Sequence, residues 1–125
     1  MVAELTLPWP PSVNRAYRHV GARVLISRAG RQFREKVVSI ALGVAKLKGR
    51  LSMTATFHPP DNRRRDLDNL MKLTQDSLQH AGLYEDDSQI KHLHLHMGAP
   101  MPPLGMCHVR IEEVDSSSEG AGEAR

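Results

Sequence analysis

The sequence has one cysteine, few aromatic side chains and no long apolar stretch. Because Cys107 is alone, it cannot form an internal disulfide, and a reducing cytoplasm is the simplest location for the protein. Phe, Trp and Tyr make up 4% of the 125 residues, so the core must be built from aliphatic side chains. No apolar run approaches the ~20 residues of a membrane span, and the N-terminus lacks the plan of a signal peptide. The length predicts one domain, and the lack of a long apolar run predicts no membrane partner.

Positive charge is concentrated in the first half of the chain. Residues 1–65 hold 13 lysines and arginines against three acids, whereas residues 112–125 hold five acids against one arginine. A basic surplus of this size attracts polyanions such as nucleic acid, although it also serves solubility alone. Residues 115–125 are small, polar and acidic, and we expect them to be a disordered tail after a folded domain of residues 1–114.

Alternation of apolar and polar residues predicts four strands, at residues 2–7, 51–58, 90–97 and 107–114. A short fifth strand is indicated at residues 23–27. Residues 8–19 are rich in proline and then basic, which favours a loop that cannot join a central strand.

Two helices fit between these strands. The first is capped by Ser27 and runs to about Lys48, with apolar residues at the 3.6-residue period. The second begins near residues 66–69, runs to His80 and ends at Gly82. Its inward-facing residues are Leu70, Met71, Thr74 and Leu78. The order of elements predicts an α/β (α+β) fold, a small single domain with a four- to five-stranded mixed sheet and two helices packed on one face.

The stretch DNRRRDLDNLMK, residues 61–72, places three arginines directly before Asp66 and Asp68, with Lys72 four residues after Asp68. If the chain is extended here, both carboxylates point to the same side. If Asp68 is already helical, Lys72 shares its face of the helix. Either way the acids lie at a helix N-terminus, which favours anions. The structural alternative is a capping aspartate with an ordinary i,i+4 ion pair.

A second acidic group, Glu85, Asp86 and Asp87, lies between the second helix and the next strand. That strand runs back along the helix, so the two acidic groups can meet. Carboxylates that meet without a cation repel one another, and Mg²⁺ relieves this by binding carboxylate and phosphate oxygens. Arginines beside the acids then serve as phosphate clamps, with Arg65 the nearest. The pattern favours metal-assisted phosphodiester hydrolysis, in which Lys72 orients water or neutralises transition-state charge.

Three histidines, His92, His94 and His96, share one face of a predicted strand and raise the alternative of a zinc site. Residues two apart on a flat strand are ~6–7 Å apart, which is awkward for three ligands of one tetrahedral ion. We therefore expect these side chains to face solvent or DNA.

Three blocks of the sequence resemble the RusA family of Holliday junction resolvases. They are LPWPPSVNRAYRH near the N-terminus, RRRDLDNLMK in the middle and GLYEDDSQI after it, and the similarity covers roughly residues 4–114. The resemblance implies a magnesium-dependent endonuclease, bacterial or phage-encoded, that acts as a homodimer. Its substrate would be branched DNA, the Holliday junction, nicked symmetrically during DNA recombination and repair. We expect Mn²⁺ to substitute for Mg²⁺.

Carried over residue by residue, the resemblance makes Asp66, Asp68 and Asp87 the catalytic acids and metal ligands, with Lys72 as a supporting catalytic residue. The implied DNA contacts are Arg64, Arg65, Asn14, Arg15, Tyr17 and Arg18. Glu85 stands where the family can have an apolar residue, and we expect no role for it. Two other functions stay open: a basic junction-binding module that does not cut, and a nuclease acting more broadly on branched DNA.

Overall fold

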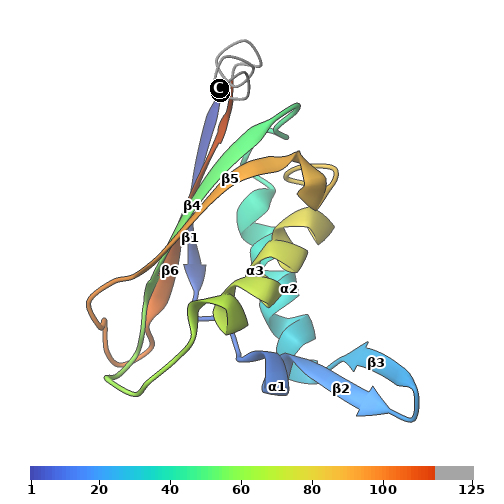
Figure 1. Ribbon diagram of the computed structural model, residues 1–125, viewed down its shortest axis with the longest axis vertical. Coiled ribbons are helices and arrows are strands. Elements are labelled where there is room, and N and C mark those ends of the chain that lie inside the picture. The colour runs from blue at the N-terminus through green and yellow to red at the C-terminus, as the bar shows by residue number, and fades with distance from the viewer. Residues whose placement is uncertain (115–125) are drawn as a thin grey trace, which may run out of the picture.

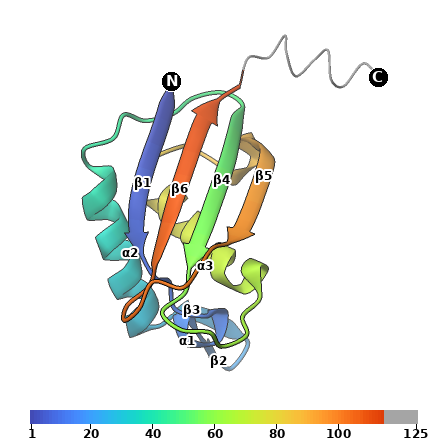
Figure 2. The same cartoon turned by 90° about the vertical axis from the view of Figure 1, so that its left-hand side faces the viewer.

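The computed structural model describes residues 1–114, and a four-stranded sheet dominates them. Its strands are β1 (Val2–Pro8), β4 (Leu51–His58), β5 (Ile90–Met97) and β6 (Met106–Glu113). They lie in the order β1-β6-β4-β5, and within this sheet only β4 and β5 run parallel (Figure 2). The predicted mixed sheet and its four strands are confirmed. The predicted tail, residues 115–125, lies outside the described residues.

The two long helices, α2 (Arg28–Ala41) and α3 (Leu67–His80), pack over the same face of the sheet, as predicted (Figure 1). The alternation in β4 explains this arrangement, because every second residue points at the helices. These inward residues, all fully buried, are Leu51, Met53, Ala55 and Phe57. Helix α3 is the crossover between the parallel strands β4 and β5, a connection that parallel pairing requires. None of the helices in residues 1–114 is long and apolar enough to cross a bilayer.

Helix α2 begins as predicted but ends earlier. The side chain of Ser27 caps it by accepting a hydrogen bond from the backbone N–H of Gly30 at 3.1 Å. The expected extension to Lys48 is wrong, since the helix stops at Ala41. The following segment is held by other elements: the N–H of Leu47 donates to the carbonyl of Leu83 at 2.8 Å. Leu47 keeps the apolar period of the helix and is buried, yet it reaches the core from a loop.

Helix α3 matches its expected bounds, from Leu67 to His80. Gly82 follows with a φ of 79°, the left-handed conformation that commonly closes a helix and suits glycine. The four residues expected to face inward, Leu70, Met71, Thr74 and Leu78, are all buried. The amphipathic face of α3 therefore fixes the helix against the sheet and leaves its acidic side toward solvent.

Residues 8–19 are not a loop throughout. They contain the short helix α1 (Val13–Ala16) and the start of strand β2 (Tyr17–Val20). Strand β3 (Arg23–Ile26) matches the expected fifth strand, but it pairs with β2 in a separate hairpin and not with the main sheet. The hairpin projects from the foot of the helices (Figure 1). It carries few buried side chains, so its sequence lacks the alternation that marks the sheet strands.

Strand β5 is an edge of the sheet, and its inner face is only partly covered. Leu93 and Met97, on the same face of β5 as Leu95, are 42% and 40% exposed. They share the face of the buried β4 residues with which they pair, Met53 and Phe57. The helices therefore leave an open margin along β5.

Candidate active site

A cleft of about 330 Å³ lies along this open margin, between α3 and β5. Asp68 and Lys72 come from the first half of α3, and Asp87 comes from the short 3₁₀ helix η1 (Asp87–Gln89) that precedes β5. The cleft thus gathers side chains from two separated segments, as the sequence predicted for these residues. Its lining is completed by Met71, Gln75, Asp76, Leu93 and Leu95.

Asp66 and Asp68 lie on different sides of the start of α3. Asp66 is the residue before the helix, with extended backbone angles, whereas Asp68 is already helical. Asp68 therefore faces the cleft, while Asp66 lines two neighbouring hollows together with Arg64 and Arg65. Of the two arrangements considered for this stretch, the structure has the helical one for Asp68. Helical rotation of about 100° per residue separates side chains two positions apart.

Within residues 1–114, Asp66 does not cap α3 with its side chain and Asp68 does not pair with Lys72. Asp66 occupies the capping position of α3, yet its side chain makes no capping hydrogen bond. Asp68 accepts a hydrogen bond from the N–H of Asn69 at 3.1 Å and forms no ion pair with Lys72 among the described residues. Lys72 instead lies over the ring of Tyr17, with its Nζ 5.6 Å from the ring centroid. The structural alternative of a cap plus an i,i+4 ion pair is therefore absent here.

Asp86 and Asp87 are adjacent but face different partners. Asp86 caps η1, because its Oδ2 accepts a hydrogen bond from the N–H of Ser88 at 2.9 Å. Asp87 points to the cleft, where its Oδ1 accepts from the buried hydroxyl of Tyr84 at 3.0 Å. The N–H of Asp87 donates to Oε1 of Gln79 at 3.2 Å. These contacts support the choice of Asp87 over Asp86 as the functional acid.

The surroundings of Asp87 disfavour its negative charge. Burial raises the pKa of the Asp87 carboxyl, the hydrogen bond from Tyr84 lowers it, and the nearby charges of Asp76 and Asp86 raise it further. A cation in the cleft would offset both the burial and the repulsion. Asp87 is thus an acid whose environment favours a positively charged partner.

Asp76 is a fourth charged side chain of the cleft that sequence reasoning missed. A single acid in the middle of a helix resembles an ordinary solvated residue. Its spacing was informative, however, because Asp68, Lys72 and Asp76 recur every four residues and so share one face of α3. Among residues 1–114, no three acidic, histidine or cysteine side chains converge closely enough to form a complete metal-binding group.

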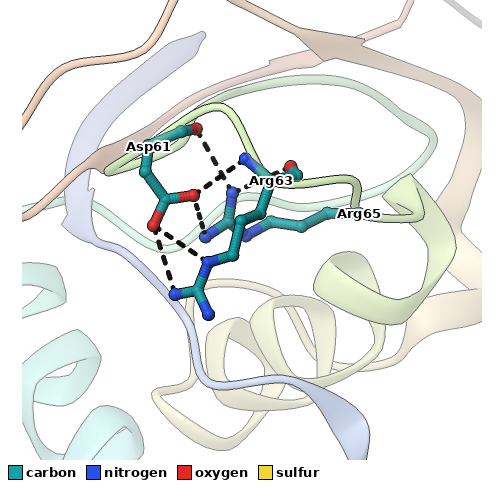
Figure 3. A network of polar contacts seen from close by, with 3 residues as sticks. All are labelled: Asp61, Arg63 and Arg65. Atoms are coloured by element: carbon teal, nitrogen blue, oxygen red, sulfur yellow. Dashed lines mark hydrogen bonds and ion pairs between the residues drawn. The ribbon is translucent and has the colours of Figure 1, made fainter.

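Residues 61–65, which we call the arginine loop, precede α3 and are held together by contacts with Asp61 (Figure 3). One carboxylate oxygen of Asp61 accepts from the N–H of Arg63 at 2.9 Å and lies 2.8 Å from Nη2 of Arg65. The other oxygen accepts from Nε of Arg63 at 3.2 Å. The Arg63 backbone hydrogen bond, followed by its side-chain bond, lowers the pKa of Asp61 to about 2. Arg65 also lies over Trp9, 5.3 Å from the ring centroid, so its guanidinium is held in place.

Arg64 differs from Arg63 and Arg65 in having no ion pair with Asp61. It is exposed and forms no hydrogen bond or ion pair with another residue of 1–114. It lines a basic groove of about 540 Å³ between the proline-rich segment, the start of α2 and the arginine loop. Arg15 and Lys36 lie in the same groove, and no acid lines it among the described residues. This groove is a suitable surface for a phosphate backbone.

The other residues expected to contact DNA lie beside this groove or on the hairpin. Asn14, next to Arg15 on α1, and Arg18 on β2 are exposed. Tyr17 is only partly exposed, because its hydroxyl donates a hydrogen bond to Oδ2 of Asp76 at 2.6 Å. It therefore faces the acidic side of α3, not open solvent.

His92, His94 and His96 lie on the outer face of the sheet, away from the cleft. All three are exposed, and they pair with Ser52, Thr54 and Thr56 of β4. Glu85 is exposed near Arg34 and His80, outside the acidic cleft. Neither group contributes to the cleft.

An acidic cleft thus lies next to a basic groove on a small α+β domain, a combination that suits an enzyme acting on a nucleic acid backbone. Comparison with known proteins identifies the family. The sequence profile described as "Endodeoxyribonuclease RusA" matches residues 8–111. The chain therefore belongs to the RusA endodeoxyribonuclease family, which confirms the resemblance seen in its three sequence blocks.

Named relatives agree with this assignment. A protein of Enterobacteria phage 82, named "Crossover junction endodeoxyribonuclease rusA", is 47% identical over 90 residues, covering 69% of this chain and 74% of the relative. The protein of the same name from Enterobacteria phage HK97 is 38% identical over 117 residues, covering 90% and 96%. The relative of that name from Escherichia coli (strain K12) is 46% identical over 90 residues, covering 69% and 74%.

Proposed function

We propose that this protein is a Mg²⁺-dependent endonuclease that resolves four-way DNA junctions by paired, symmetric nicks in recombination and repair. The observation that carries the proposal is the shared cleft of Asp68, Lys72 and Asp87, in a chain of the RusA family. The relatives' name, crossover junction endodeoxyribonuclease, supports a branched DNA substrate. The catalytic domain comprises residues 1–114.

The donor chemistry of the cleft fits Mg²⁺. This ion takes oxygen ligands, usually one or two carboxylates with water and phosphate oxygens, and so does not need a closed protein cage. Asp68 and Asp87 supply such carboxylates, and Asp66, which lines the neighbouring hollows and not the cleft, is the third candidate. Mn²⁺ accepts the same oxygen donors. Either ion, when bound, would polarise the scissile phosphate and favour ionisation of the attacking water.

The chain's own cations bind the substrate. Lys72 is exposed and lines the cleft, so its ammonium group can neutralise charge that develops on the phosphate. Arg64 and Arg15 hold the backbone in the basic groove, with Asn14 and Arg18 extending the contact surface. Arg65 holds the arginine loop in shape through its ion pair with Asp61. The N–H groups of Arg65 that contacts within the loop do not use are available to a phosphate. The basic groove binds the DNA backbone, and the acidic cleft cuts it.

A homodimer suits the reaction, because a four-way junction has approximate two-fold symmetry and resolution needs two nicks. One chain has one acidic cleft among its described residues, so a two-fold pair provides the second. The backbone edge of β5 is unpaired in the described sheet, which leaves it free to contact a partner. Light scattering of the purified protein tests this: a mass near that of one 13.9 kDa chain contradicts it.

The cytoplasm remains the proposed location. Cys107 is buried, and burial raises the pKa of its thiol to about 12. Cys107 behaves as a small core residue. It forms no disulfide, the bond that is typical of proteins in oxidising compartments.

The decisive experiment is cleavage of a synthetic mobile four-way junction with Mg²⁺. We expect the wild type to cut opposed strands, and Asp68→Asn and Asp87→Asn to bind the junction without cutting it. Asp86→Asn is the matched control, since Asp86 caps η1 and does not line the cleft. It should retain near wild-type cleavage. Activity that survives in Asp68→Asn and Asp87→Asn would contradict the proposed site.

The same assay separates the two rival functions. A binding module would retain junction affinity but show no Mg²⁺-dependent cleavage by the wild type. A broader nuclease would cut forks or linear duplex as fast as it cuts the junction. We expect junction cleavage to exceed duplex cleavage at equal DNA concentration.

A further inference from the structure

Tyr17 bridges two charged side chains of α3. Its hydroxyl donates a hydrogen bond to Oδ2 of Asp76 at 2.6 Å, and its ring lies under the ammonium of Lys72, with Nζ 5.6 Å from the centroid. Lys72 and Asp76 are one helical turn apart and therefore share a face of α3. One aromatic residue thus contacts both.

Both partners of Tyr17 line the acidic cleft, whereas Tyr17 itself does not. Among residues 1–114, Lys72 forms no ion pair with Asp68 or Asp76, so the ring of Tyr17 is the contact that orients its ammonium. Burial, followed by the hydrogen bond and the charge of Asp76, raises the pKa of Tyr17, while Arg34 on α2 lowers it. The phenol stays protonated at neutral pH and remains a donor to Asp76.

The position of Tyr17 in the chain links this contact to the surface expected to bind DNA. Tyr17 is the first residue of β2 and directly follows α1. The N–H of Ser27 donates to the carbonyl of Ala16 at 2.8 Å, which closes the base of the hairpin against α1. Exposed Arg18 follows Tyr17 on the same strand. A displacement of the hairpin base would therefore change the position of the Lys72 ammonium.

We propose that Tyr17 is a positioning residue that holds Lys72 and Asp76 in the cleft, so that the hairpin and the acidic cleft act as one unit. This inference rests on the proposed nuclease function and differs from the sequence expectation, in which Tyr17 contacts DNA. A DNA contact contributes to affinity. A positioning residue contributes to the rate of the bound complex, because the enzyme–DNA contacts are kept while the geometry of Lys72 is lost.

The first test separates rate from affinity. Junction affinity is measured in EDTA, and single-turnover cleavage is measured with Mg²⁺ at saturating protein. Tyr17→Phe keeps the ring and removes the hydroxyl, whereas Tyr17→Leu removes both contacts. We expect affinities within about twofold of wild type, a rate about fivefold lower for Tyr17→Phe and a larger loss for Tyr17→Leu. A loss of affinity with an unchanged saturated rate would make Tyr17 a DNA contact and overturn the proposal.

The second test is a double-mutant cycle between Tyr17→Phe and Asp76→Ala. If Asp76 acts through the hydroxyl of Tyr17, the double variant is no slower than the slower single variant. Asp76→Asn keeps an oxygen that accepts from the hydroxyl and should recover at least half of the rate lost in Asp76→Ala. Multiplying effects, or a raised Mg²⁺ requirement in Asp76→Ala, would make Asp76 an independent group or a metal ligand and overturn the proposal.

A third readout does not depend on cleavage. An aromatic ring shifts the NMR signals of protons held over it, so the ε-methylene signal of Lys72 should be displaced upfield in wild type. The displacement should be smaller in Tyr17→Phe, whose ring is no longer held by Asp76, and absent in Tyr17→Leu. Val20→Ala, an exposed change at the far end of β2, is the control and should leave the signal displaced. An undisplaced wild-type signal contradicts the contact. A displaced signal in a protein that cuts no junction would contradict the proposed function but confirm the contact between Tyr17 and Lys72.

Discussion

The hydroxyl of Tyr84 lies 3.0 Å from Oδ1 of Asp87 and 3.0 Å from the carbonyl oxygen of Gln75. A hydroxyl has one proton, so it can donate to only one of these acceptors at a time. Tyr84 is fully buried, and its ring cannot swing away from the cleft without opening the core. The core thereby fixes the direction of an acid that the proposed mechanism needs.

Tyr84→Phe should slow junction cleavage while leaving junction affinity unchanged. Without the hydroxyl the carboxylate of Asp87 can turn away from its position in the cleft, so the rate should fall roughly tenfold. The removed hydroxyl also costs roughly 1 kcal/mol in the free energy of unfolding, which urea denaturation measures. Wild-type cleavage by a stably folded Tyr84→Phe protein would show that the orientation of Asp87 does not depend on Tyr84.

Arg64→Gln should weaken junction binding, and Arg63→Gln should weaken it less. Both arginines line the basic groove, but Arg64 has no ionic partner among the described residues, whereas the guanidinium of Arg63 is 3.2 Å from Asp61. Loss of one phosphate contact reduces the slope of log K against log salt by about one. Binding titrations at several salt concentrations measure this slope. Equal slopes for Arg64→Gln and wild type would exclude a phosphate contact.

Periodicity predicted the elements that bury a face. Strand β4 and helix α3 repeat apolar residues at periods of two and 3.6, and both have the expected bounds to within a residue. The same signal failed beyond Ala41, because Leu47 is apolar at a helical interval but packs from a loop. The first strand of the hairpin was missed for the opposite reason: residues 17–20 bury too few side chains for an alternating pattern to form.

The candidate site was predicted in residue type more completely than in geometry. Asp68, Lys72 and Asp87 do share a cleft, and their family is confirmed. Whether Asp66 faces the same way depended on the residue at which α3 begins, and a sequence gives helix ends only to within a few residues. Asp86 and Asp87 differ in their hydrogen bonds to Ser88 and Tyr84, and only the resemblance to the RusA family singled out Asp87 before the structure showed this difference.

The carboxyl group of Asp61 should titrate near pH 2. Its pKa is lowered in the folded protein from an ordinary value of 3.8, so the stabilisation is complete above pH 4 and is lost as pH falls through about 2. Carboxyl-detected NMR measures the midpoint. In Arg63→Gln the midpoint should rise only part of the way, since the N–H of residue 63 still donates. A midpoint near 3.8 in wild type would mean that the arginine loop is not ordered by Asp61.

Gly30→Ala should destabilise the protein, although alanine is the better helix former. Propensity alone predicts a gain of about 1 kcal/mol. A Cβ at this position, however, would lie 2.5 Å from the carbonyl oxygen of Ala16 and 2.7 Å from a side-chain carbon of Ile26. The first contact is backbone, which cannot move without shifting α1 and the adjoining Tyr17.

We therefore expect a net loss of roughly 1–3 kcal/mol in the free energy of unfolding, measured by urea denaturation. Gly43→Ala is the matched control, because nothing lies within 4 Å of its Cβ position just after α2. It should change stability by less than about 0.5 kcal/mol. If Gly30→Ala were as stable as Gly43→Ala, the start of α2 would not be packed against α1, and the hairpin would lose the rigid base through which Tyr17 reaches Lys72.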